Sequence, residues 1–266
     1  MKQDHEIDFR IIGEEMQCVE IELDPQETAI GESGSFMMMD REIQMETIFG
    51  DGSNNRNNSG FMSKLMSAGK RLLTGESLFM TAFTNAGNAK KKVTFAAPFP
   101  GKIIALDLYR LNGKVICQKD AFLCAAKGVS IGIEFQRKLG TGLFGGEGFI
   151  MQKLEGDGMA FVHAGGHVLE RELQPGEMIK IDTGCIVAFT QTVHYDIQFI
   201  GGIKNSIFGG EGLFFATLEG PGKVWIQSLP ISRLASRIMS YGSIGGRKEE
   251  GSILGGLGNL LDGDGM

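Results

Sequence analysis

Short runs in which apolar and polar residues alternate are the main pattern in this sequence. In one such run, 19–23, apolar side chains occupy every second position and glutamates lie between them. A period of two is typical of a β-strand that buries one face. Comparable short runs recur along most of the chain, separated by glycine, proline or asparagine. The pattern therefore predicts an all-β protein.

A motif with a central glutamate and a following apolar run occurs three times. Its copies lie at 73–80, 144–151 and 208–215, and each is followed by a turn-forming segment and a second apolar run. This succession is typical of two strands joined by a tight turn, so we expect a β-hairpin in each copy. The expected turns are at 85–87, 156–158 and 220–222.

A second motif lies between the copies of the first. Segment 19–27 aligns with 169–177, an offset of 150 residues, and 111–114 aligns with 174–177, an offset of 63. Three copies of each motif predict three β-barrel-like repeats, related by a pseudo-three-fold axis, in one compact prism. We assign two repeats to 75–138 and 144–203, and the third to two terminal halves, 7–49 and 208–229, which would pair and bring the termini together.

Two segments depart from the β pattern. Residues 50–73 begin as a polar loop and continue into 61–73, where apolar residues gather on one helical face, so we expect a short inserted helix. Apolar residues at helical spacing in 231–241 predict a C-terminal helical segment. We therefore treat 1–241 as a single domain and expect the glycine-rich tail at 242–266 to be flexible.

Composition and charge narrow the class of protein. The chain has 266 residues, four cysteines and a formal net charge of -6 at pH 7. A negative surface repels phosphate, so we expect no nucleic-acid partner. No apolar run reaches the ~18 residues of a membrane-spanning helix, and the first residues lack the features of a targeting segment. We expect a cytoplasmic protein with reduced cysteines and no transmembrane segment.

Three glutamates and two histidines are the candidates for metal binding. Glu76, Glu147 and Glu211 occupy one position of the repeated motif, so a three-fold arrangement would gather their carboxylates into a cation site. The favoured alternative is that each accepts backbone N–H bonds and stabilises a turn. His163 and His167 flank a short turn, and a tight hairpin would place their imidazoles opposite each other as metal ligands. Because no third ligand is evident, we favour an exposed pair and expect no metal and no cofactor.

No catalytic residues are recognisable in the sequence. It contains neither a G-x-S-x-G nucleophile elbow nor a cysteine with a plausible histidine partner. We therefore expect a protein that is not an enzyme.

The repeated glycine-glutamate motif, the Glu-Leu-x-Pro element and the three methionines at 37–39 together resemble the altered-inheritance-of-mitochondria family over roughly residues 7–240. The resemblance implies three β-barrel-like repeats arranged like subunits of the tryptophan RNA-binding attenuation protein. It also implies an unknown biochemical function, a fungal relative linked to mitochondrial inner-membrane organisation, and no catalytic residues. Tryptophan and RNA binding are not carried over, because a shared fold does not imply a shared function.

A scaffold or interaction module is the function we expect. It would self-associate or bind a protein partner, which could link it to a membrane, and the helix at 61–73 could itself contact a membrane peripherally. The alternative is a binder of a small ligand or metal in crevices between repeats. Met37, Met38 and Met39 cannot all face inward on one strand, so we expect at least one of them at an interface.

Overall fold

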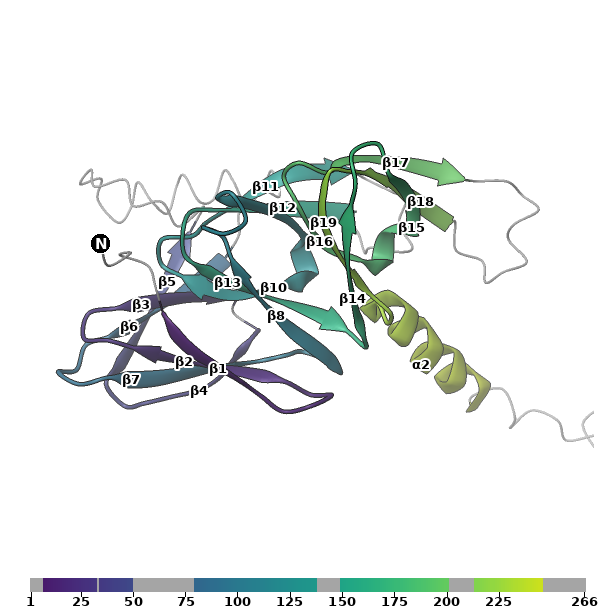
Figure 1. Ribbon diagram of the computed structural model, residues 1–266. Helices are drawn as coiled ribbons and strands as arrows, with labels where there is room; N and C mark the ends of the chain where they lie inside the picture. Colours follow the sequence, from purple (N-terminus) through teal and green to yellow (C-terminus); the bar gives the residue numbers. More distant parts are fainter. Residues whose placement is uncertain (1–6, 33, 50–78, 138–148, 201–212, 246–266) are drawn as a thin grey trace, which may run out of the picture. The chain divides into compact units, whose positions relative to one another are not determined.

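The chain divides into two compact units, Met1–Pro230 and Ile231–Met266. The structure is a computed structural model that describes residues 7–32, 34–49, 79–137, 149–200 and 213–245 (Figure 1). All strands of the described residues lie in unit 1, and helix α2 (Ile231–Gly245) belongs to unit 2. The all-β class is confirmed.

The predicted C-terminal helix is also confirmed, but its limits differ from the prediction. Helix α2 continues to Gly245, so residues 242–245 are helical rather than part of a flexible tail. The division between compact units falls before residue 231, where this helix begins, and not after residue 241. The apolar spacing that identified the helix fades in its last turn, because that turn contains glycines and serine.

Nineteen strands are present in the described residues, and eighteen of them form three successive modules of six. Strand β1 (Asp8–Ile12) precedes the modules. Module 1 spans residues 18–96 and contains β2 (Cys18–Leu23), β3 (Thr28–Glu32), β4 (Phe36–Met39), β5 (Ile43–Phe49), β6 (Phe79–Asn85) and β7 (Lys91–Ala96). Module 2 spans 101–165 and contains β8 (Gly101–Asp107), β9 (Lys114–Gln118), β10 (Phe122–Ala126), β11 (Ser130–Arg137), β12 (Phe149–Glu155) and β13 (Met159–Gly165). Module 3 spans 168–227 and contains β14 (Val168–Leu173), β15 (Met178–Asp182), β16 (Ile186–Thr190), β17 (His194–Ile200), β18 (Leu213–Glu219) and β19 (Gly222–Gln227).

The three modules pair their strands in the same order. Sheet A has the order β1-β2-β7-β4, sheet B β5-β6-β3-β10-β13-β8, sheet C β11-β12-β9-β16-β19-β14 and sheet D β15-β18-β17. Advancing the strand numbers by six converts β2-β7-β4 into β8-β13-β10 and then into β14-β19-β16. The same step converts β5-β6-β3 into β11-β12-β9 and then into β17-β18-β15. Each module is therefore a pair of three-stranded half-sheets.

Two antiparallel ladders join the modules. Strand β3 pairs with β10, so modules 1 and 2 share sheet B, and β9 pairs with β16, so modules 2 and 3 share sheet C. The equivalent third ladder would pair β15 with β4, but each of these strands is the last of its sheet in the described residues. Sheets A and D each contain one such half-sheet without a ladder between them, and the closed three-fold ring stays a prediction.

The expected hairpins are not formed. Strands β6 and β7 flank the turn at 85–87, but β6 belongs to sheet B and β7 to sheet A. The turns at 156–158 and 220–222 likewise connect strands of different sheets. Turn residues reverse the chain whether the next strand pairs with the previous one or crosses to a facing sheet, and the alternating pattern is the same in both cases.

The terminal halves also pair differently from the prediction. Strands β2 to β5 pair with β6 and β7, whereas β18 and β19 pair with strands of module 3. Described residues of 7–49 therefore share no ladder with 213–227. Pairing with the adjacent segment closes a shorter loop, which costs less entropy than joining the two ends of the chain. The expected closeness of the termini concerns residues outside the described ranges.

The two segments aligned at an offset of 150 residues form turns with the same hydrogen bond. Glu27 accepts a hydrogen bond from the backbone N–H of Asp24 (2.8 Å), and Glu177 accepts one from Gln174 (2.9 Å). Each carboxylate thus closes the turn between the first two strands of its module. The third aligned turn shares a left-handed residue with these two: Gln26, Gly113 and Gly176 have φ angles of 70, 79 and 77°.

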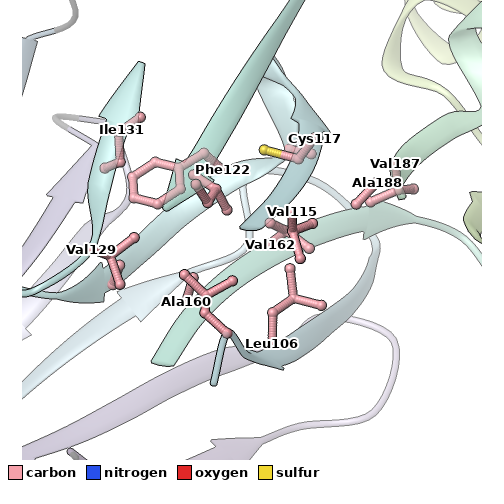
Figure 2. Close-up of a cluster of buried hydrophobic side chains, with 14 of the residues drawn as sticks. Leu106, Val115, Cys117, Phe122, Val129, Ile131, Ala160, Val162, Val187 and Ala188 are labelled. Atoms are coloured by element: carbon pink, nitrogen blue, oxygen red, sulfur yellow. The ribbon is translucent and has the colours of Figure 1, made fainter. Parts of the chain in front are cut away.

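Apolar side chains fill three clusters between successive sheets. The cluster in Figure 2 joins sheets B and C and includes Phe122 and Val162 from sheet B and Val115 and Cys117 from sheet C. A second cluster lies between sheets A and B and a third between sheets C and D. Sheets B and C are therefore buried on both faces, which explains why strands such as β13 carry nearly continuous apolar runs.

Gly101, the first residue of β8, tests how closely β8 and β13 pack. A Cβ atom at this position would collide with the backbone carbonyl oxygen of Ala164, which cannot move away without breaking the ladder. We expect Gly101→Ala to lower the free energy of unfolding by more than ~2 kcal/mol in chemical denaturation. The control is Gly34→Ala, because no heavy atom lies within 4 Å of the added Cβ. Equal stability of the two variants would contradict this packing.

Candidate interaction surface

Strand β4 exposes four consecutive apolar side chains. The exposed fractions are 37% for Phe36, 54% for Met37, 52% for Met38 and 37% for Met39. In β10 and β16, which hold the same place in modules 2 and 3, every residue is buried. The three strands are alike in apolar character, so the difference lies in what covers them.

The three strands also share the same irregular register. The ladders β4–β7, β10–β13 and β16–β19 each contain one register shift after the first paired residue. This shift makes the strands comparable residue by residue. The equivalent sets are Phe36, Phe122 and Ile186; Met38, Cys124 and Ala188; and Met39, Ala125 and Phe189.

Strand β4 is held from one side by β7. The backbone N–H of Asp40 donates to the carbonyl of Lys92 (2.9 Å), and the backbone N–H of Lys92 donates to Oδ2 of Asp40 (2.8 Å). The ring of Phe36 also stacks on Phe83, with centroids 5.5 Å apart. Since successive residues of a strand direct their backbone groups to opposite sides, the N–H and C=O of Met39 point toward the free edge.

Strand β15 is the edge strand of sheet D and, like β4 in sheet A, pairs with a described strand on one side alone. Met178 is 56% exposed and Lys180 is exposed, whereas the equivalent strands β3 and β9 are almost completely buried. The carbonyl of Glu177 accepts a hydrogen bond from Gly220 (2.9 Å), on the side of β18. By the same alternation, the backbone groups of Met178 and Lys180 point away from β18 toward the free edge.

The lysines of β7 and the turn before it are paired with carboxylates. Lys90 lies 2.8 Å from Asp8 and 2.9 Å from Glu22, and hydrogen bonds to these carboxylates raise its pKa. The neighbouring pairs are Lys91 with Glu42 (3.0 Å) and Lys92 with Glu20 (2.9 Å). This group of lysines therefore presents balanced charge beside sheet A.

His163 and His167 do not form the predicted facing pair. They lie at the end of β13 and before β14, which belong to different sheets, so no hairpin joins them. His163 is buried and His167 is exposed. Within the described residues, no three histidine, cysteine, aspartate or glutamate side chains are grouped so that they could hold a metal ion.

His163 is a core side chain. Its ring meets Phe99 edge to face, with centroids 4.3 Å apart, and neither ring nitrogen makes a hydrogen bond of normal geometry. Burial lowers the pKa of His163 to about 4, and the nearby backbone of Phe99 opposes this shift only partly. The imidazole is therefore neutral near pH 7.

The remaining candidate residues are less informative. Glu76, Glu147, Glu211 and the helix expected at 61–73 lie outside the described residues. Burial raises the pKa of the Cys117 and Cys124 thiols. No helix in the described part of the chain has both the length and the apolar character required to cross a bilayer.

The fold defines an all-β protein of stacked sheets whose notable surface feature is the exposed apolar strand β4. The chain belongs to the mitochondrial biogenesis AIM24 family, whose model matches residues 9–229, and the resemblance seen in the sequence is thereby confirmed. An uncharacterized protein of Streptococcus pyogenes serotype M6 is 32% identical over 231 residues, which cover 84% of this chain and 86% of that protein. A crystal structure of a Streptococcus pyogenes protein has the same fold, with a TM-score of 0.69, 26% identity, and coverage of 88% of this chain and 99% of that one. These relatives leave the biochemical function undefined.

The environment of His163 predicts a dependence of stability on pH. Its folded-state pKa of about 4 lies below the ordinary value of 6.5, so the unfolded chain binds the proton more readily. The neutral, buried imidazole therefore contributes fully to the free energy of unfolding above pH 6.5. This contribution is lost as the pH falls toward 4, by up to about 3 kcal/mol. We expect His163→Phe to reduce the loss of stability between pH 6.5 and 4 in urea titrations. His167→Phe, at an exposed position, is the matched control; an unchanged slope in the His163 variant would contradict the assignment.

Proposed function

We propose that this protein is a non-enzymatic interaction module that binds a protein partner along the free edge of β4. The observation that carries the proposal is the exposure of Phe36, Met37, Met38 and Met39, whose counterparts in β10 and β16 are all buried. An exposed apolar edge favours uncontrolled association, so proteins usually cover such edges.

Strand β4 has both features that strand addition requires. The backbone groups of Met39 supply hydrogen bonds to an added strand, and the flanking side chains supply apolar contact area. Methionine is flexible and polarizable, so it adapts to a partner surface more easily than a branched side chain does. Because β4 is hydrogen-bonded to β7 on its other side, its conformation is already ordered in the unbound protein, which lowers the entropic cost of binding.

We place this module in the cytoplasm, where a partner could link it to a membrane. The buried thiols of Cys117 and Cys124, in apolar strands, support a reducing compartment. Binding of a small ligand or metal in crevices is the other function expected from the sequence, but no observation on the described residues favours it.

Methionine oxidation in intact cells tests the proposal. In cells that naturally make the protein, we expect a partner to slow oxidation of Met37, Met38 and Met39 at least several-fold relative to the dilute purified protein. Met45 on β5 is 49% exposed and serves as the matched exposed control, and Met151, which is buried, marks unfolded protein. Equal oxidation of the three methionines in cells and in dilute solution would contradict a covered β4.

A further inference from the structure

We infer that the strand that covers β4 is β15 of a second copy of this chain, so that copies join head to tail through a third ladder of the intermodule type. This inference rests on the proposed function, because it names the occupant of the same surface. It follows from the two junctions within the chain, from the register they impose, and from the backbone groups at the two free edges.

The existing junctions give the register of the third. In the first junction Ala125 of β10 lies opposite Ile30 of β3, and in the second Phe189 of β16 lies opposite Ile116 of β9. Met39 is the equivalent of Ala125 and Phe189. Lys180 is the equivalent of Ile30 and Ile116, because each is the third residue of its strand. The third ladder therefore places Met39 opposite Lys180 and Met38 opposite Ile181.

The backbone geometry agrees with this register. Met39 directs its N–H and C=O away from β7, and Lys180 directs its own away from β18, as the bonds of Asp40 and Glu177 establish. Two such residues placed opposite each other in an antiparallel ladder exchange two hydrogen bonds. In the first junction the ladder continues with a bond from Lys127 N–H to the carbonyl of Thr28 (3.2 Å). The corresponding bond would join Arg41 to Met178.

The side chains favour a junction between copies over one within a chain. At the position of Met38 and Ile181, the first junction holds Cys124 and Gly31, and the second holds Ala188 and Cys117. The small pairs lie inside the packed body, where Phe95 already fills the space beside Gly31. Closing the same chain would place a methionine and an isoleucine in the equivalent interior position. Between two copies, the extra volume can remain partly at the surface.

The contact uses different surfaces on the two copies. A copy that receives β15 of one neighbour at its β4 can still offer its own β15 to another, so assembly continues until a ring closes or the chain of copies ends. The joined sheet would have the order β2-β7-β4-β15-β18-β17, with β1 added beyond β2. Omitting β1, its first half is β8-β13-β10 of sheet B reduced by six, and its second half is β9-β12-β11 of sheet C advanced by six.

Two complementary variants of the full chain test the inference. Met39→Pro removes an edge N–H from β4, and Lys180→Pro removes one from β15, while the bonds to β7 and β18 remain. We expect the wild type to form assemblies whose size rises with concentration in sedimentation velocity, and each variant alone to be monomeric. A mixture of the two variants should give a 1:1 dimer that does not grow, because it retains one intact β4 and one intact β15.

A second variant tests the same junction without proline, which could itself disturb folding. Met38→Lys places a charge in the apolar part of the junction on an exposed side chain, and we expect it to abolish assembly while the circular dichroism spectrum and unfolding midpoint stay unchanged. Met45→Lys, at another exposed methionine, is the matched control and should assemble as the wild type does. Equal assembly of the two lysine variants would overturn the inference.

Cysteine pairing distinguishes a second copy from closure of the same chain. Chains carrying both Met39→Cys and Lys180→Cys, prepared in light and heavy isotope forms and mixed before mild oxidation, should give disulfides that join light to heavy peptides. Disulfides confined to single chains, or a mixture of the proline variants that stays monomeric, would overturn the inference. Protection of the three methionines in cells would then still support a different protein partner, so the two proposals fail separately.

Discussion

The backbone hydrogen bonds along strand edges are the constraint on which the rest of this structure depends. A buried strand must find partners for the N–H and C=O groups on both of its sides. Each module provides both partners for the central strand of its half-sheets, but β3, β9, β10 and β16 obtain their second partner from a neighbouring module. The ladders β3–β10 and β9–β16 therefore join the three modules and create two sheets, B and C, that are buried on both faces.

The same constraint explains why β4 and β15 differ from their counterparts. Each has a partner on one side and none among the described strands on the other, because the described residues hold no module before module 1 or after module 3. Strand β4 nevertheless keeps an apolar sequence, like that of the buried β10 and β16. An edge strand that ended the protein in water would ordinarily carry charges or proline. The function we propose thus follows from the pairing order, because β4 has one strand partner among the described strands and its equivalents β10 and β16 have two.

The sequence predicted local features such as strands and turns, but it did not predict which strands pair with each other. The alignment of 19–27 with 169–177 identified a real repeated turn, since Glu27 and Glu177 make the same backbone contact. The predicted hairpins were wrong because alternation cannot distinguish a paired strand from one in a facing sheet. The predicted pairing of His163 with His167 failed for the same reason. The exposure of β4 was only partly foreseen, since methionines in a strand usually indicate a core.

Amide hydrogen exchange of β4 as a function of protein concentration tests the central claim most directly. The account predicts that peptides from β4 exchange slowly in concentrated protein and quickly after dilution, while peptides from β10 and β16 stay protected at both concentrations because their junctions lie within the chain. Exchange in β4 that is equally fast at all concentrations, and unaffected by extract of the cells that make the protein, would contradict the account.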